Sequence, residues 1–208
     1  MPDVEPEPEV AASLFRERIE LARQFTADLA HRGEELGLIG PLELPRLWSR
    51  HVVNCALVAP LVRAGRMGDV GSGAGLPGLV LAIARPDAHF VLIEPMERRV
   101  EWLRAEAGEL GLDNVTVVRA RAEEAKLNEP LDQVTARAVT ALSKLIPMTV
   151  PLVRSGGELI FMKGGRVNEE LDAAQKVIRK TRLTNVEVLV LGERIAPEST
   201  RVFRATVD

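Results

Sequence analysis

The pattern of apolar and polar residues changes once along the chain, near Gly65. Before this point, apolar residues recur at helical spacing in two segments, from Val10 to Gly33 and from Pro45 to about Leu61. Proline is favoured as the first residue of a helix and glycine commonly ends one, which agrees with these bounds. The first part of the chain is therefore predicted to be helical.

After Gly65, short apolar runs alternate with helical patterns. Seven strands are expected, at 66–70, 89–93, 114–118, 132–136, 157–162, 184–191 and 201–207. Helices are expected near 77–85, 97–110, 122–126, 140–153 and 168–180, the third of them short and weak. This alternation predicts an α/β fold, a mostly parallel sheet with helices on both faces. The last two strands have no helix between them, so we expect them to form a hairpin and place an antiparallel strand at one edge.

These patterns divide the chain into a disordered acidic tail (1–9), an N-terminal helical part (10–62) and a Rossmann-like domain (63–208). The length of 208 residues suits one main domain with an extension. The single cysteine, Cys55, excludes an internal disulfide framework, and three scattered histidines argue against a structural metal. No metal and no partner copy are required, so we expect a monomer.

Membrane insertion and secretion are not indicated. The longest uncharged run, Val70–Ala84, has 15 residues and is interrupted by glycine and proline, too short to span a bilayer. The N-terminus lacks the basic start and apolar stretch of a signal peptide, so a cytoplasmic protein is expected. The net charge is −3, but residues 137–208 carry 12 Lys and Arg against 8 Asp and Glu. This excess indicates either a local phosphate-facing patch or solvated helix surfaces.

The strongest signal is the glycine-rich segment from Asp69 to Gly78, which follows the first strand and leads into a helix. Glycines there permit a tight turn and a close approach of backbone N–H groups to a ligand. Gly73, Gly75 and Gly78 can be read as the G-x-G-x-x-G of a dinucleotide site. The D-x-G-x-G-x-G pattern that begins at Asp69 instead resembles the cofactor loop of class I S-adenosylmethionine-dependent methyltransferases. An acid at this strand end suits a ligand with an ammonium and a sulfonium better than a pyrophosphate.

Further candidate residues follow the next strands. Glu94 ends the second strand, where a carboxylate can accept hydrogen bonds from the two hydroxyls of an adenosine ribose. Arg137 ends the fourth strand and could bind a cofactor carboxylate or an RNA phosphate. The loop from Lys163 to Arg166 is typical of a flexible anion-binding segment. His51 could contact a phosphate or be a core histidine.

The absence of some residue types is informative about the reaction. The chain has no tyrosine, so it lacks the Asp/Asn-Pro-Pro-Tyr motif of methylases that act on amino groups of bases. It also has no Pro-Cys motif for attack on a pyrimidine ring, and Cys55 lies in a predicted helix distant from the glycine loop. We therefore interpret Cys55 as a small buried apolar residue rather than a nucleophile.

Three separated segments carry a family resemblance. They are LWSRHVVNC, DVGSGAGLPGLVLAIARPDAHFVLIEPMERRVEWLR, and TARAVTALSKL with PLVRSGGELIFMKGG. From roughly Leu14 to the C-terminus the chain resembles the bacterial 16S ribosomal RNA guanine-N7 methyltransferases, also called the glucose-inhibited division protein B family. The resemblance implies a class I methyltransferase fold, S-adenosylmethionine as methyl donor and a guanine of small-subunit ribosomal RNA as acceptor.

The resemblance also implies roles for individual residues. Together with the loop pattern and the position of Glu94, it gives as cofactor-binding residues Asp69, Gly71, Ser72, Gly73, Leu76, Glu94, Ala122, Glu123 and Arg137. The residues expected to face RNA are Arg50, His51, Arg121, Lys163 and Arg166. One departure is Asn54-Cys55, where the family more often has Asp-Ser.

The implied chemistry needs no catalytic base, because guanine N7 has a free lone pair and loses no proton when it is methylated. Catalysis is then mainly positioning, with Arg137 as the one side chain that could take part. Two alternatives stay open from the residues alone. One is a nucleotide-dependent oxidoreductase that uses the other glycine frame, and the other is a catalytically silent module that binds RNA or the ribosome.

Overall fold

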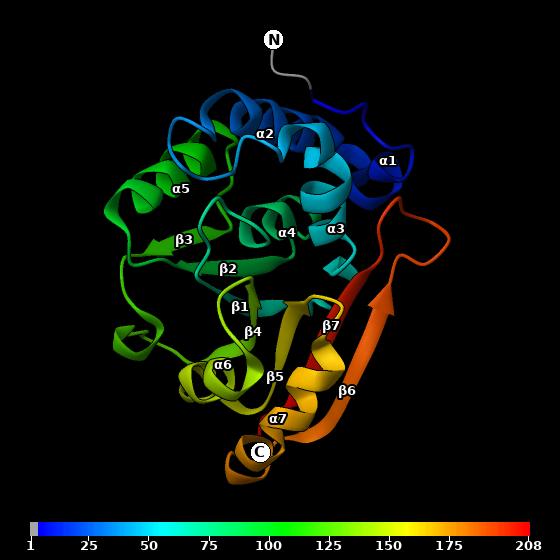
Figure 1. Cartoon of the computed structure of the whole chain (residues 1–208). Helices are drawn as coiled ribbons and strands as arrows, with labels where there is room; N and C mark the ends of the chain where they lie inside the picture. Colours follow the sequence, from blue (N-terminus) through cyan, green and yellow to red (C-terminus); the bar gives the residue numbers. More distant parts are fainter. Residues whose placement is uncertain (1–3) are drawn as a thin grey trace.

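The computed structural model describes residues 4–208 and shows a seven-stranded sheet between two layers of helices (Figure 1). The strands are β1 (Gly65–Val70), β2 (Ala88–Ile93), β3 (Val115–Val118), β4 (Leu131–Arg137), β5 (Val153–Lys163), β6 (Thr184–Leu191) and β7 (Thr200–Thr206). The longer helices are α1 (Val10–Phe15), α2 (Ile19–Arg32), α4 (Gly78–Ala84), α5 (Glu97–Glu109), α6 (Leu142–Thr149) and α7 (Val167–Lys180).

The strand order in the sheet is β3-β2-β1-β4-β5-β7-β6. The first five strands are parallel, and β7 pairs antiparallel with both β5 and β6. The expected α/β fold and terminal hairpin are therefore confirmed, with the antiparallel β7 one position inside β6. After β1 the chain continues to β2 on one side, and after β4 it continues to β5 on the other side. In open α/β sheets, ligands bind beside the carboxyl ends of the two strands at which the chain diverges in this way.

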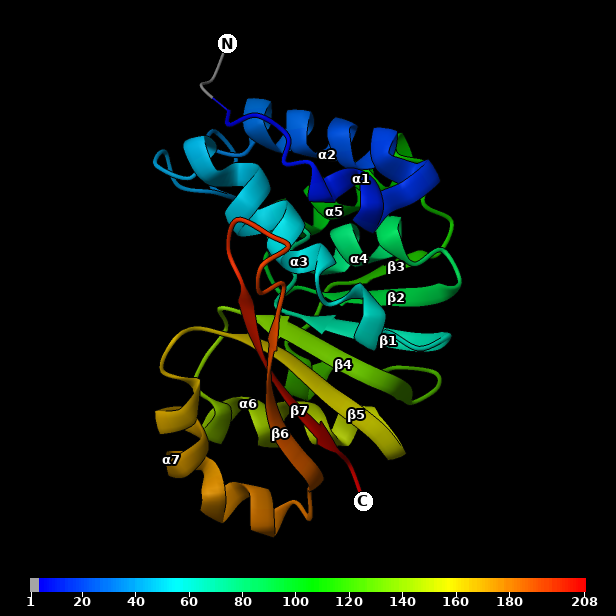
Figure 2. The ribbon, with the colours of Figure 1, turned by 90° about the vertical axis from the view of Figure 1, so that its right-hand side faces the viewer.

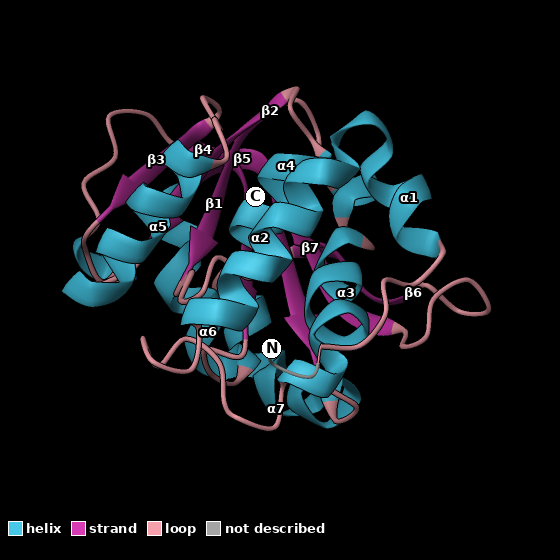
Figure 3. Ribbon diagram, turned by 90° about the horizontal axis from the view of Figure 1, so that it is seen from above, coloured by secondary structure: helices cyan, strands magenta, loops and turns pink. Residues whose placement is uncertain are grey.

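Two cores hold the sheet between its helix layers (Figure 2). One joins the N-terminal helices, α4 and α5 to one face, and the other joins α6 and α7 to the opposite face. Seen from above, α2 lies between α5 and the short helix α3 (Asn54–Ala56) (Figure 3). The helices that precede β1 thus share their apolar core with the sheet.

The second N-terminal helix differs from the single helix that the sequence predicts. It is divided into one tight turn (Leu44–Arg46), the wide π-type helix η3 (Leu47–Val53), α3 and a last tight turn (Ala59–Leu61). Wide turns of this type rotate the following side chains and occur often at functional sites. The helix predicted from Val10 to Gly33 is also divided, because Arg16 has φ of 50° and the tight turn Arg16–Arg18 separates α1 from α2. The bounds of the other helices agree within a few residues. The weak helix at 122–126 is the single turn η5 (Ala122–Glu124), and the helix predicted at 140–153 is α6 followed by a tight turn.

The acidic N-terminal segment is not a free tail where the structure describes it, from residue 4 onward. Val4 packs against the core, and the Glu5 carboxylate accepts hydrogen bonds from the backbone N–H of Ser49 at 2.6 Å and from its hydroxyl at 2.9 Å. Glu7 pairs with Arg23 of α2 at 2.6 Å. The expected disorder of residues 1–9 is thus wrong for the segment from Val4 to Glu7, because Val4 is packed and both of its acids have partners, and residues 1–3 lie outside the described part.

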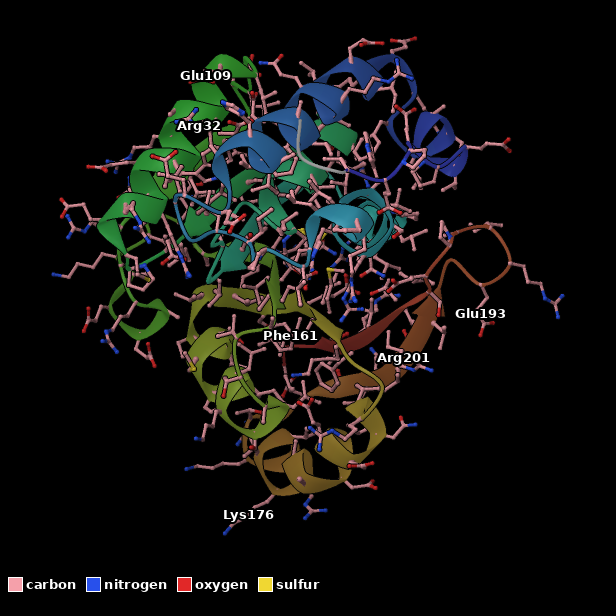
Figure 4. The ribbon with its side chains drawn as sticks, turned by 45° about the horizontal axis from the view of Figure 1, so that its top comes forward. Arg32, Glu109, Phe161, Lys176, Glu193 and Arg201 are labelled. Atoms are coloured by element: carbon pink, nitrogen blue, oxygen red, sulfur yellow. The ribbon has the colours of Figure 1, made fainter. Side chains whose placement is uncertain are left out.

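A buried acid lies between α2 and α5. Glu106 has no exposed surface, and neither carboxylate oxygen has a hydrogen-bond partner among residues 4–208. Asp28 and Glu109 place carboxylate oxygens within 4.8 Å of it, and Arg32 pairs with Glu109 at 3.7 Å (Figure 4). Burial first, and then the neighbouring acids, raise the pKa of Glu106 to about 8.

Glu106 should therefore make the stability of the fold fall as pH rises. Since the unfolded chain releases this proton near pH 4.5 and the folded chain near pH 8, the folded state binds more protons between these values. Glu106→Gln is expected to stabilise the protein by about 1 kcal/mol at pH 8 and to make its unfolding free energy depend less on pH. Urea unfolding at pH 5 and pH 8 tests this, with the exposed Glu101→Gln on the same helix as control. Parallel pH profiles for Glu106→Gln and the wild type would contradict it.

No helix in the part of the chain that the structure describes is both long and apolar enough to cross a membrane.

Candidate cofactor site and substrate groove

The glycine loop between β1 and α4 adopts backbone conformations that other residues rarely tolerate. Gly71, Gly73 and Gly75 have φ values of 71°, 54° and 93°. The N–H of Gly71 donates to the carbonyl of Ile93 at 2.8 Å, which ties the start of the loop to the end of β2. These glycines turn the chain sharply above the carboxyl end of β1.

Glu94 is fixed beside this loop, directly after β2. Its side chain is buried, and one carboxylate oxygen accepts the N–H of Gly73 at 2.9 Å while the other accepts the N–H of Met96 at 3.0 Å. A carboxylate oxygen has two lone pairs, so each oxygen keeps one acceptor direction for a ligand hydroxyl. This arrangement fits a ribose whose two hydroxyls donate to one carboxylate.

Asp69 lies under the loop and is fully buried. One carboxylate oxygen accepts the N–H of Gly78 at 2.9 Å, and the other has no partner among the residues that are described. Burial raises the pKa of Asp69 to about 7, against the opposing effect of the nearby Ser72 hydroxyl, which donates to the Asp69 backbone carbonyl at 2.9 Å, and of the Gly78 N–H. A cationic group of a ligand near this unpartnered oxygen would favour the ionised acid, which fits the ammonium and sulfonium of S-adenosylmethionine.

The remaining predicted cofactor residues lie on both sides of β1. Ala122, which is buried, and Glu123, which is exposed, form the turn after β3, and Arg137 ends β4. Trp102 of α5 donates its indole N–H to the carbonyl of Ala74 at 3.0 Å and so supports the loop from its other side. Since β3, β2, β1 and β4 are neighbours, their carboxyl ends bring all these residues to one edge of the sheet.

Arg137 is held by side chains from the N-terminal helices. One guanidinium nitrogen lies 2.5 Å from Nδ1 of His51, and another lies 3.2 Å from Sγ of Cys55. Ala138, the next residue, has φ of 53°, a strained conformation for a residue with a Cβ. It turns the chain so that Val139 covers Gly71, where an added Cβ would come within 2.8 Å of Val139.

A groove of about 860 Å³ opens next to this point, over the carboxyl ends of β4 and β5. Its basic lining residues are Arg50, Arg137, Lys163, Arg166 and Arg201. Val139 also lines the groove and covers Gly71, so the groove adjoins the glycine loop. Its far wall is the start of β7 and the hairpin loop before it, where Glu198 pairs with Arg50 at 3.1 Å.

The predicted RNA-facing residues are not all brought together. Arg50, Lys163 and Arg166 line the groove, but Lys163 is 10% exposed and pairs with Glu170 at 2.7 Å. His51 does not line the groove, because it is buried against Arg137. Arg121 is exposed after β3, on the far side of the glycine loop from the groove.

Sequence reasoning missed two groove features. Arg201 belongs to β7, and only the insertion of β7 beside β5 brings it to the groove. Asn54, at the departure from the family motif, lines the groove and donates weakly to the carbonyl of Ser199 at 3.4 Å. The basic character of the C-terminal third was the one signal for Arg201.

The strand order and the glycine loop after β1 define a class I S-adenosylmethionine-dependent methyltransferase fold. The crystal structure of precorrin-6y C5,15-methyltransferase from Geobacter metallireducens shares this fold, with a TM-score of 0.57 and 17% identity over 75% of this chain and 88% of that one.

The sequence comparisons are more specific. The family model for rRNA small subunit methyltransferase G matches residues 18–198. The ribosomal RNA small subunit methyltransferase G of Leifsonia xyli is 66% identical over 98% of both chains, and that of Clavibacter michiganensis is 65% identical over 98% of this chain and 97% of its own. The chain belongs to the rRNA small subunit methyltransferase G family, which confirms the resemblance seen in the sequence.

Proposed function

We propose that this protein transfers a methyl group from S-adenosylmethionine to N7 of a guanine in 16S ribosomal RNA, acting in the cytoplasm as a monomer. The observation that carries the proposal is the buried Glu94 carboxylate, fixed to a glycine loop that itself adjoins, through Val139, a groove with five basic residues. The membership of the family supports the RNA substrate. The relatives carry the name of a methyltransferase of small-subunit ribosomal RNA.

In this proposal the residues at the carboxyl edge of the sheet hold the methyl donor. Glu94 binds the ribose hydroxyls, Asp69 faces the cationic methionine part, and Arg137 binds the methionine carboxylate. Gly71, Ser72, Gly73 and Leu76 supply the backbone of the loop, and Ala122 with Glu123 lines the adenine side. When bound, S-adenosylmethionine supplies an electrophilic methyl group on its sulfonium.

The residues of the groove would orient the RNA so that one guanine reaches the loop. Since N7 presents a free lone pair, the protein needs to position the base and exclude water rather than remove a proton. Positioning of this kind can contribute roughly 7–11 kcal/mol to the lowering of a barrier. Among the groove cations, Arg166 and Arg201 are exposed and pair with no acid among residues 4–208, whereas Arg50 and Lys163 would have to exchange Glu198 and Glu170 for a phosphate.

Two experiments test the proposal against the alternatives. Calorimetry should show binding of S-adenosylhomocysteine and not of NADH, and the reverse result would indicate an oxidoreductase. Transfer of a radiolabelled methyl group to under-methylated ribosomal RNA, followed by mass spectrometry of digested RNA, should locate 7-methylguanosine. Cofactor binding without any transfer to free RNA or to small subunits would instead indicate a silent binding module.

The groove should determine RNA affinity through its exposed cations. Arg166→Ala and Arg201→Ala are each expected to weaken RNA binding and to reduce the salt dependence of log K by about 0.7–0.9, because one phosphate contact is lost. Affinity for S-adenosylhomocysteine should stay unchanged. The measurement is a salt titration of RNA affinity for each variant, with Lys163→Ala and Arg121→Ala included.

Lys176→Ala is the matched control, since Lys176 lies on α7, far from Arg201 (Figure 4). It should leave both the affinity and the salt dependence unchanged. If Lys176→Ala reduces the salt dependence and the groove variants do not, RNA binds along α7 instead.

Cys55 is expected to be dispensable for the chemistry. It is fully buried, and burial raises the pKa of its thiol, so it is not a thiolate at neutral pH. Cys55→Ala should keep turnover within a few-fold of the wild type, measured as methyl transfer under saturating substrates. Complete loss of turnover in a folded variant that still binds S-adenosylhomocysteine would indicate a covalent mechanism.

A further inference from the structure

A line of hydrogen-bonded side chains runs from the N-terminal helices to Arg137. The carboxylate of Glu43 lies 2.6 Å from Nε2 of His51, and Nδ1 of His51 lies 2.5 Å from a guanidinium nitrogen of Arg137. His51 is 8% exposed, so these two contacts account for both of its ring nitrogens away from solvent. Glu43 and His51 are 8 positions apart in the sequence, and His51 and Arg137 are 86 positions apart.

The partners determine the protonation of His51. Arginine can only donate, so Nδ1 must accept, and the ring proton then lies on Nε2 and is donated to the carboxylate of Glu43. Burial first, and then the charge of Arg137, lower the pKa of His51, while its hydrogen bond to His51 lowers the pKa of Glu43. The neutral Nε2–H tautomer is thus the form that completes the line at neutral pH.

We propose that His51 is a positioning residue that fixes the guanidinium of Arg137 between the glycine loop and the groove, and that Glu43 fixes the tautomer of His51. This inference rests on the proposed function, which assigns Arg137 to the carboxylate of the methyl donor. A free arginine side chain would have to be ordered each time a ligand binds, whereas Arg137 is already held. The wide π-type helix that contains Arg50 and His51 directs the first toward Glu198 in the groove and the second toward Arg137.

Two substitutions separate the nitrogens of His51. His51→Asn places an amide oxygen near the position of Nδ1 and can still accept from Arg137, whereas His51→Gln places an amide nitrogen near Nε2 and removes the acceptor at Nδ1. We expect His51→Gln to weaken binding of S-adenosylhomocysteine by about 10-fold and His51→Asn to recover most of the loss. His89→Gln is the matched control, since the ring of His89 makes its one hydrogen bond among residues 4–208 to the Thr116 hydroxyl, at 2.9 Å, and none to Arg137.

Calorimetry of both substitutions in an Arg137→Ala background shows whether His51 acts through Arg137. With alanine at 137, His51→Gln should cause no further loss of affinity. An equal loss with arginine and with alanine at 137 would overturn the inference, as would wild-type affinity of folded His51→Gln. If Arg137→Ala itself leaves the affinity for S-adenosylhomocysteine unchanged, the assignment of Arg137 in the proposed function fails. If Arg137→Ala weakens binding but His51→Gln does not, only the inference about His51 fails.

A pH profile adds a readout that a merely structural histidine would not change. Protonated His51 cannot accept a hydrogen bond from Arg137. The charged groups near its ring are Glu43, Arg50 and Arg137. Arg46 lies beyond Glu43, and the Cys55 thiol lies on the other side of Arg137. Since the pKa of His51 lies below its usual 6.5, affinity for S-adenosylhomocysteine should fall more steeply in the wild type than in His51→Asn as the pH is lowered from 7.5 to well below 6.5. Asp69 titrates in this range in every variant, so the difference between the two profiles is the measured quantity. Identical profiles would overturn the inference.

Discussion

Replacing Glu94 by alanine is expected to weaken binding of S-adenosylhomocysteine by roughly 2–4 kcal/mol, since two ribose hydroxyls lose a charged acceptor in a buried site. The structure adds a second cause. The same carboxylate accepts the N–H groups of Gly73 and Met96, so alanine also leaves two backbone donors of the site without a partner. Calorimetry with the purified variant measures the loss, and far-UV circular dichroism shows whether the fold is retained.

Two further variants sharpen this test. Glu94→Gln keeps one acceptor oxygen and should lose less affinity than alanine. Glu97→Ala removes an exposed acid three residues away, which pairs with Arg119 at 2.6 Å, and should leave the affinity unchanged. An unaltered dissociation constant for Glu94→Ala would show that the ribose lies elsewhere.

The sequence was sufficient for the parts of the site that depend on local signals. The glycines of the loop have positive φ values. Since glycine is the residue that adopts such values readily, their pattern predicts a sharp turn from the sequence alone, without knowledge of the position of the preceding strand in the sheet. Glu94 could be placed because a parallel sheet brings the end of the second strand next to the end of the first. The terminal hairpin followed from the missing helix between 191 and 200.

Contacts between distant segments could not be predicted in this way. Nothing in the pattern around His51 indicates that its ring contacts Arg137, and the regular helix predicted there would have oriented its side chains differently from the π-type helix that forms. Lys163 reads as a free cation in a glycine-rich loop, and its pairing with Glu170 depends on how α7 packs back toward β5. Arg201 reaches the groove because β7 is inserted between β5 and β6, an order that periodicity does not encode.

The tight packing of the loop against Asp69 leads to the second large expected effect. Gly78→Ala should destabilise the fold by roughly 2–3 kcal/mol, because the added Cβ overpacks a buried junction. It would lie 2.3 Å from Cδ2 of Leu92 and 2.5 Å from the carboxylate oxygen of Asp69 that accepts the Gly78 N–H. Displacement of Asp69 should also reduce affinity for S-adenosylhomocysteine more than ten-fold. Urea unfolding and calorimetry measure the two effects.

The same substitution at Gly108 provides the control, because a Cβ there meets nothing within 4 Å. Gly108 lies in α5, where alanine is favoured over glycine by roughly 0.5–1 kcal/mol, so Gly108→Ala should stabilise the protein slightly and leave cofactor binding unchanged. Opposite signs of the change in unfolding free energy for the two alanines would show that the effect at Gly78 comes from its contacts and not from the loss of a flexible residue. If Gly78→Ala is as stable as the wild type and binds S-adenosylhomocysteine normally, the loop does not depend on the close approach of Gly78 to Asp69.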